Sequence, residues 1–76
     1  MPYSKIQKEK LKQLGERVKA VRTAKDLTLK ELAFKINKDP QSIHRLEVGG
    51  INPTFLYLSE VCDGLNIDIT ELLSEL

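Results

Sequence analysis

The chain has 76 residues, a net charge of +1 and 41% hydrophobic residues, which suffices for one domain spanning residues 1–76 and leaves no room for a separate small-molecule effector domain. The sequence contains neither an apolar run long enough to span a membrane nor a secretory signal, so we expect a cytoplasmic protein with no membrane partner. Its single cysteine, Cys62, excludes an internal disulfide and falls on an apolar helix face, which favours a buried hydrophobic residue over a nucleophile.

Charge is divided unevenly between the two halves of the sequence. Residues 1–45 hold all 12 Lys and Arg against five acids, a net of +7, whereas residues 46–76 hold six acids and no Lys or Arg. For any one lysine, scattered solvated charge remains the simplest explanation. The division as a whole suits a protein that offers a basic surface to a polyanion and keeps an acidic surface away from it.

Turn residues divide the sequence into five predicted helices, at about residues 5–24, 29–36, 40–48, 53–63 and 69–75. The first can be capped by Ser4. Its apolar residues recur at spacings of three and four on one side: Leu11, Leu14, Val18 and Val21. Strand alternation is not convincing anywhere, so the predicted fold class is all-α, a compact five-helix bundle.

Local signals mark the ends of the next two segments. Thr28 and Glu31 form a capping box before the segment 29–36. Asn37 tolerates the left-handed conformation that a sharp turn needs. Asp39 can cap the following segment, and Gly49 can end it. Two short helices joined by a three-residue turn are therefore predicted, which is the helix-turn-helix arrangement.

The segment 40–48 is about two turns long and has a polar outward side. At 100° per residue Ile43 and Leu46 share one face, while Gln41 and Arg45 lie opposite. Lys and Glu would serve solubility equally well there. Hydrogen-bonding side chains on so short a helix therefore raise the question of what they contact.

The last two predicted helices carry most of the remaining apolar residues. Pro53 suits the first position of the segment 53–63, and Gly64 helps to stop it. Five residues are expected to point from this segment toward the core: Phe55, Leu58, Val61, Cys62 and Leu65. Asp68 and Glu71 form a second capping box before the segment 69–75.

Residues 27–73, LTLKELAFKINKDPQSIHRLEVGGINPTFLYLSEVCDGLNIDITELL, resemble the phage repressor and Cro family, also called the XRE family. Its members read close to LSQEELA, a turn glycine, SPSTISRIERG, NPS and LAKALGVSLDELL. The positions that match at the family's spacing are Leu32-Ala33, Ile43, Leu46-Glu47, Gly49, Asn52-Pro53, Leu58, Leu65 and Leu72-Leu73. The match runs from about Leu14 to Leu73 and implies a lambda-repressor-like fold. Within the family, the chain resembles stand-alone regulators such as restriction-modification controller proteins and small phage-type repressors.

The resemblance also implies which residues contact DNA. Gln41, Ser42 and Arg45 are expected to read bases, because these side chains pair with base edges in the major groove. Contacts to the DNA backbone are expected from Thr28, Lys30, Lys38, His44, Asn52 and Thr54. His44 is equally well read as an uncommitted surface residue. Arg22 and Glu47 occupy positions where family members form a structural ion pair between helices.

Four residues depart from the family pattern. Leu29 stands where members often carry a phosphate-binding Gln, and Asn37 replaces the usual turn glycine. Phe34 stands where a polar surface residue is usual, and Pro40 where some phage members use a base-contacting Gln. Leu29 is expected to lack the phosphate contact, and Pro40 shifts base reading onto Gln41, Ser42 and Arg45.

Apolar residues beyond those needed for the core indicate a dimer. The residues expected at its interface are Leu56, Tyr57, Ile67, Ile69, Leu73 and Leu76. Two subunits related by a two-fold axis would place their reading helices in successive major grooves, about 34 Å apart. The expected partners are therefore a double-stranded DNA operator and a second copy of the chain, with RNA polymerase as a possible third.

The sequence thus predicts a transcriptional regulator, by default a repressor, that binds a near-palindromic operator. Two alternatives remain open: a protein-interaction module that has kept this fold, favoured by Leu29, Phe34 and Pro40, and the antitoxin of a toxin-antitoxin pair. No paired carboxylates, Cys-His set or phosphate-cradling glycine loop indicates an enzyme. Neither a cofactor nor a metal is expected, since one histidine and one cysteine make no convincing ligand set.

Overall fold

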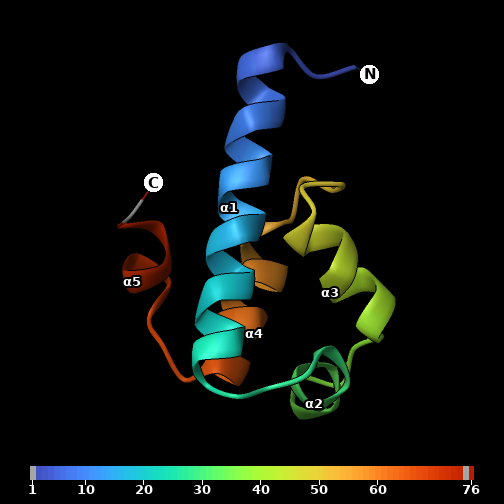
Figure 1. Cartoon of the computed structure of the whole chain (residues 1–76), viewed down its shortest axis with the longest axis vertical. Coiled ribbons are helices and arrows are strands. Elements are labelled where there is room, and N and C mark those ends of the chain that lie inside the picture. The colour runs from blue at the N-terminus through green and yellow to red at the C-terminus, as the bar shows by residue number, and fades with distance from the viewer. Residues whose placement is uncertain (1, 75) are drawn as a thin grey trace.

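The computed structural model describes residues 2–74 and 76. These form five helices: α1 (Lys5–Ala24), α2 (Leu29–Lys35), α3 (Pro40–Glu47), α4 (Phe55–Leu65) and α5 (Ile69–Leu73). The described part contains no strand, so the all-α prediction is confirmed. Helix α1 packs on α3 and α5, α2 packs on α3 and α4, and α4 packs on α5. Figure 1 shows α1 along the length of the molecule, with α3 on one side and α5 on the other.

Helix α1 is the longest element and begins beyond the rest of the fold. Ser4 and Gln7 form a capping box, in which each side chain accepts the other residue's backbone N–H. Every described residue before Leu11 is exposed, and in Figure 1 these first turns project past the other helices. Farther along, Leu14 and Val18 are buried in the core. The long first helix therefore has a packed half and a free half.

The turn between α2 and α3 is built by local side-chain chemistry. Thr28 and Glu31 form the capping box of α2, and the backbone N–H of Thr28 lowers the pKa of the Glu31 carboxyl by hydrogen bonding to the charged form. Asn37 adopts a left-handed conformation with φ of 56°. The Asp39 side chain accepts the N–H of Gln41 at 2.9 Å and caps α3. Each of the two helices ends one residue earlier than predicted.

Helix α4 differs from its predicted form at both ends. It begins at Phe55 rather than at Pro53, because the Thr54 hydroxyl accepts the N–H of Tyr57 at 3.1 Å and caps it. It continues through Gly64 to Leu65, and Asn66 takes the left-handed conformation that ends it. Gly64 is buried inside the helix, where an added Cβ would lie 2.6 Å from Ile36 Cγ2. This glycine therefore allows α2 to approach α4 and does not act as a stop.

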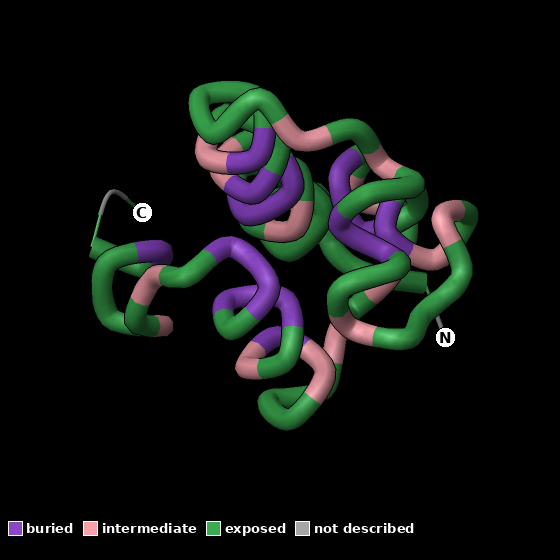
Figure 2. The backbone as a smooth tube through the Cα atoms, turned by 90° about the horizontal axis from the view of Figure 1, so that it is seen from below, coloured by how far each residue is buried: buried purple, intermediate pink, exposed green. Residues whose placement is uncertain are grey.

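The core lies among the inward sides of all five helices. Its fully buried side chains come from every helix: Val18, Leu32, Ile43, Leu46, Val61, Cys62, Leu65 and Leu72. Figure 2 shows buried positions recurring along the helices between exposed ones, as expected for helices with one apolar side. The prediction that Phe55 points into this core is wrong, since its side chain is 68% exposed. At the first turn of α4, it faces solvent.

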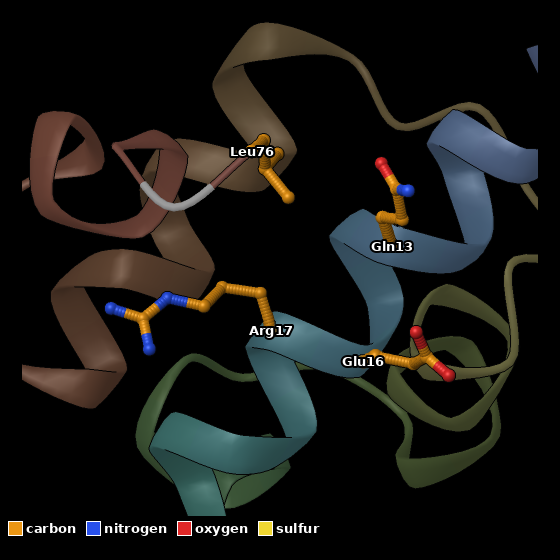
Figure 3. Close-up of a pocket in the computed structure, with 4 residues that line it drawn as sticks. All are labelled: Gln13, Glu16, Arg17 and Leu76. Atoms are coloured by element: carbon orange, nitrogen blue, oxygen red, sulfur yellow. The ribbon is translucent and has the colours of Figure 1, made fainter.

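The C-terminal segment is attached to α1 as well as to α4. An α1 residue, Arg17, reaches toward α5 (Figure 3), and its Nη2 lies 3.5 Å from the carbonyl oxygen of Glu71. Helix α5 ends at Leu73 rather than at the predicted residue 75; residue 75 lies outside the described part. Over residues 2–74 and 76, none of the helices combines the length and the apolarity that crossing a membrane requires.

Candidate nucleic-acid interface

Helix α3 presents one exposed stripe to solvent. Gln41, His44, Arg45 and Val48 are all exposed, and at 100° per residue they lie within about 100° of one another on the helix surface. The opposite side of α3 is buried in the core through Ile43 and Leu46. We call Gln41, His44, Arg45 and Val48 the α3 stripe. None of these four side chains is covered by another part of the described chain.

Ser42 lies at the edge of the α3 stripe and is half-buried. Its hydroxyl donates to the carbonyl oxygen of Asp39 at 2.9 Å. The Tyr57 hydroxyl of α4 lies 3.0 Å from Ser42 Oγ, and because the serine proton is already used, Tyr57 is the donor in this pair. Ser42 therefore ties α3 to its own cap and to α4, and its only proton is engaged within the chain.

A buried ion pair joins α3 to α1. Arg22 Nε donates to Glu47 Oε2 at 2.7 Å and Nη2 donates to Oε1 at 3.0 Å, so the contact is bidentate. Nη1 donates at 2.7 Å to the carbonyl oxygen of Leu27, just before α2. The hydrogen bond to Glu47 raises the pKa of Arg22 above its ordinary value, so the guanidinium stays protonated. The structure thus brings Arg22 and Glu47 together and holds α3 against both helices before it.

The C-terminal end of α3 lies directly on the backbone of α1. An added Cβ at Gly15 would collide with the backbone carbonyl oxygens of Leu46 and Glu47. Gly49 has a φ of 76°, and its added Cβ would lie 2.9 Å from Lys12 Cα. Glycine at both positions lets the two backbones meet. The direction in which the α3 stripe points is therefore fixed by contacts that leave no room for a side chain.

The residues expected to contact the DNA backbone are spread around α3. Lys30, His44 and Asn52 are exposed, as are Thr28 and Thr54 at the caps of α2 and α4. The hydroxyls of both threonines accept a backbone N–H, which leaves their protons free for another acceptor. Lys38 is different, because its Nζ lies 3.5 Å from Glu60 Oε1 in an exposed ion pair.

The residues expected at a dimer interface fall into two groups. Leu56, Leu73 and Leu76 are exposed, with Leu56 at 72%. Tyr57, Ile67 and Ile69 are only partly exposed and pack against the core of their own chain. The exposure of Phe55 could not be predicted from the sequence, because its spacing of three residues from Leu58 predicts that both lie on the inward side of the helix. Phe34 on α2 is also 88% exposed, and helix α1 does not cover it.

The described residues include no cluster of metal ligands, and their one cysteine is buried. No three His, Cys, Asp or Glu side chains among them are placed to hold a metal ion. Cys62 is buried, and its burial raises the pKa of the thiol, which keeps it protonated and weakly nucleophilic.

A helix-turn-helix family model matches residues 18–72. No curated protein matches the sequence. The structure is similar to the restriction-modification controller protein C.AhdI from Aeromonas hydrophila, with 29% identity and a TM-score of 0.83 over 86% of this chain and 98% of that one.

Two further solved structures are similar over most of both chains. The clp gene regulator ClgR from C. glutamicum has 30% identity and a TM-score of 0.80, covering 84% of this chain and 83% of that one. The restriction-modification controller protein C.Esp1396I, solved as a tetramer in complex with its natural 35 base-pair operator, has 26% identity and a TM-score of 0.79. That match covers 86% of each chain.

Proposed function

The chain belongs to the helix-turn-helix family, and from this membership we propose that it is a sequence-specific, DNA-binding transcriptional regulator that acts as a homodimer. The resemblance to XRE-type regulators and to restriction-modification controller proteins is confirmed by the matched family model and by the similar structures. Binding to DNA and regulation of transcription follow from the family. The residues that contact DNA, the dimer and the form of the operator are our proposals.

The α3 stripe is the observation that supports specific reading. An α-helix fits the major groove of B-DNA, where Gln pairs with adenine and Arg with guanine through two hydrogen bonds each. Gln41 and Arg45 are exposed on the same side of α3 and would enter the groove together. His44 and Val48 complete the stripe, and the Val48 methyl groups suit contact with a thymine methyl. Ser42 would support this geometry through Tyr57.

Backbone contacts would position α3 in the groove. Thr28 and Lys30 lie at the start of α2, and Asn52 and Thr54 precede α4, so the two pairs lie in different segments on either side of α3 in the chain. Contacts of this kind fix the register of a protein on DNA without reading sequence. Lys38 would join them only by leaving Glu60, which costs little because exposed ion pairs contribute about 0 to 1 kcal/mol.

A dimer would double the number of bases that are read. The exposed leucines of α4 and α5 supply an apolar surface in the half of the chain that lacks Lys and Arg, which is unsuited to facing DNA. A two-fold axis would place the α3 helices about 34 Å apart on a near-palindromic operator. Occupancy would then depend on protein concentration. Repression, in which the bound protein blocks RNA polymerase, is the simplest mode of action. Alternatively, the acidic surface would contact polymerase directly and activate transcription.

Replacing Arg45 with alanine tests the proposed reading. We expect the preference at one base position of each half-site to fall by about 1 to 3 kcal/mol, because a bidentate contact to guanine is lost. The preference is measured by selecting bound duplexes from a random pool before and after the change. Lys38→Ala is the matched control, since losing an exposed cation should at most weaken binding evenly across sequences. Equal losses on every sequence for Arg45→Ala would contradict the assignment.

Replacing Leu56 and Leu73 together with glutamate tests the proposed dimer. Both side chains are exposed in one subunit, so the fold should survive while a buried interface would acquire unpaired charges. We expect a monomer by sedimentation and weaker operator binding at equal concentration. Phe34→Glu changes an even more exposed apolar residue, on α2, and should leave the dimer intact. A double variant that remains dimeric would place the interface elsewhere.

The second candidate is a protein-interaction module, of which an antitoxin would be one form. The exposed ring of Phe34 favours it, because a large apolar side chain on the outer side of α2 suits contact with another protein. A salt titration of duplex binding separates the two functions. A DNA reader should lose affinity steeply as salt rises and should discriminate among sequences, and an interaction module should do neither.

A further inference from the structure

Four lysines of α1 lie along one side of the helix. Lys5, Lys8, Lys12 and Lys19 are spaced by three, four and seven residues, which at 100° per residue places them within about 60° of one another. All four are exposed. We call them the α1 lysine stripe. Lys10 and Lys25 do not belong to it, because each lies more than about 100° away around the helix.

The α1 lysine stripe runs directly past the C-terminal end of α3. Gly15, which lies on the same side of α1, receives the backbone of α3, and the backbone of Lys12 lies under Gly49. Lys12 and Lys19 line one surface hollow together with His44 and Val48 of the α3 stripe. The lysines beside this crossing therefore border the surface that would face DNA.

The other half of the stripe extends beyond the body of the protein. Lys5 and Lys8 belong to the first turns of α1, where every described residue is exposed and which project past the remaining helices (Figure 1). From Lys5 to Lys19 the helix rises by about 21 Å at 1.5 Å per residue. Measured along the DNA helix axis, where each strand has one phosphate per about 3.4 Å, this corresponds to about six nucleotides.

Two acids of α1, Glu9 and Glu16, lie on the same side as the stripe, so its four lysines leave it net positive. The ion pairs found within the described part of the chain are Arg22 with Glu47 and Lys38 with Glu60, and none involves a lysine of the stripe. Two acids border the hollow that contains Lys12 and Lys19. Glu47 is neutralised by Arg22, which leaves the exposed Glu16 as the one acid without an ion-pair partner there. Two lysines against one such acid leave the hollow net positive.

Building on the proposed function, we infer that the α1 lysine stripe is a second phosphate-binding surface that extends the DNA contact beyond the segment read by α3. Lys12 and Lys19 would bind phosphates next to the groove occupied by α3, and Lys5 and Lys8 would follow the same strand outward. These contacts carry no base information. They would raise affinity for every sequence and enlarge the protected segment of each half-site.

The salt dependence of binding tests this inference. In the unaltered protein, log Kobs should fall linearly with log salt, by about 0.9 for each phosphate contact. The double variant Lys12→Ala/Lys19→Ala removes four contacts from a dimer, so the slope should become shallower by up to about 3.6. The sequence preference obtained from a random pool should stay the same. Ethylation of the phosphates next to the groove, which are assigned to Lys12 and Lys19, should interfere with binding of the unaltered protein and should cease to interfere with the variant.

A matched control is offered by Lys25 and Lys35. They are equally exposed and lie at the C-terminal ends of α1 and α2, where the partial negative charge of the last carbonyls disfavours phosphate. Lys25→Ala/Lys35→Ala should leave the slope unchanged although it removes the same net charge. Equal slopes for the stripe variant and the unaltered protein would overturn the inference and leave the proposed function standing. If DNA binding by the unaltered protein neither depended on salt nor discriminated among sequences, the proposed function would be overturned instead.

Discussion

Replacing Glu47 with alanine should lower the free energy of unfolding by about 3 to 5 kcal/mol, because the guanidinium of Arg22 would remain buried without its partner. Arg22 is 8% exposed and Glu47 is 5% exposed, so water cannot replace the lost contacts without opening the structure. At about 0.05 to 0.15 kcal/mol per residue, the 76 residues hold a total stability of the same order. Urea unfolding followed by circular dichroism measures the change.

The double variant Arg22→Met/Glu47→Leu is the control for this prediction. It removes both charges and keeps most of the side-chain volume, which is often neutral or stabilising for a buried pair. We expect its stability to lie much closer to that of the unaltered protein than either single variant does. A double variant as unstable as Glu47→Ala would mean that packing, and not a stranded charge, accounts for the loss.

Replacing Gly15 with alanine should lower the stability by about 2 to 3 kcal/mol, in the upper part of the range for overpacked sites. In a helix interior, alanine is ordinarily favoured over glycine by about 1 kcal/mol, so the sign of the effect is opposite to that of helix propensity. The added Cβ would meet the carbonyl oxygens of Leu46 and Glu47. These are backbone atoms, so α3 itself would have to move, and operator affinity should fall as well.

An exposed site on the same helix separates the effect of helix propensity from that of the close backbone contact. Ala20→Gly, which faces solvent, should cost about 1 kcal/mol through propensity alone. Unfolding of both variants in urea, together with binding to the selected operator, gives the comparison. If Gly15→Ala proved more stable than the unaltered protein, the close crossing of α1 and α3 would be refuted.

The parts of the fold that could be predicted from the sequence are those set by local chemistry. Asp39, Pro40 and Gly49 specify the ends of α3 within a few residues, and the structure uses Asp39 as a cap and Gly49 in a left-handed turn. The start of α4 was misplaced because Pro53 and Thr54 both carry signals for a helix start. The hydroxyl of Thr54 is the one that caps the helix.

Longer-range contacts could not be predicted in this way. A glycine near the end of a helical pattern is typical of a helix stop, and Gly64 was predicted to be one. Only the approach of Leu32 and Ile36 from α2 explains why it lies inside α4. Of the candidate site, the exposure of Gln41 and Arg45 follows from helical periodicity. The hydrogen bond that draws Ser42 toward Tyr57 spans 15 residues of sequence and has no local signature.

The exposed α3 stripe separates the residues that choose a target from those that hold the protein together. Gln41, His44, Arg45 and Val48 face solvent, and changes at exposed positions of this kind usually alter stability by no more than about 0.5 kcal/mol. Single substitutions in the stripe can therefore change the DNA sequence that such a protein prefers, in evolution or in the laboratory, while the fold stays intact. Ser42, next to Gln41, and Glu47, next to Val48, do not have this freedom, because their side chains are bonded to other helices.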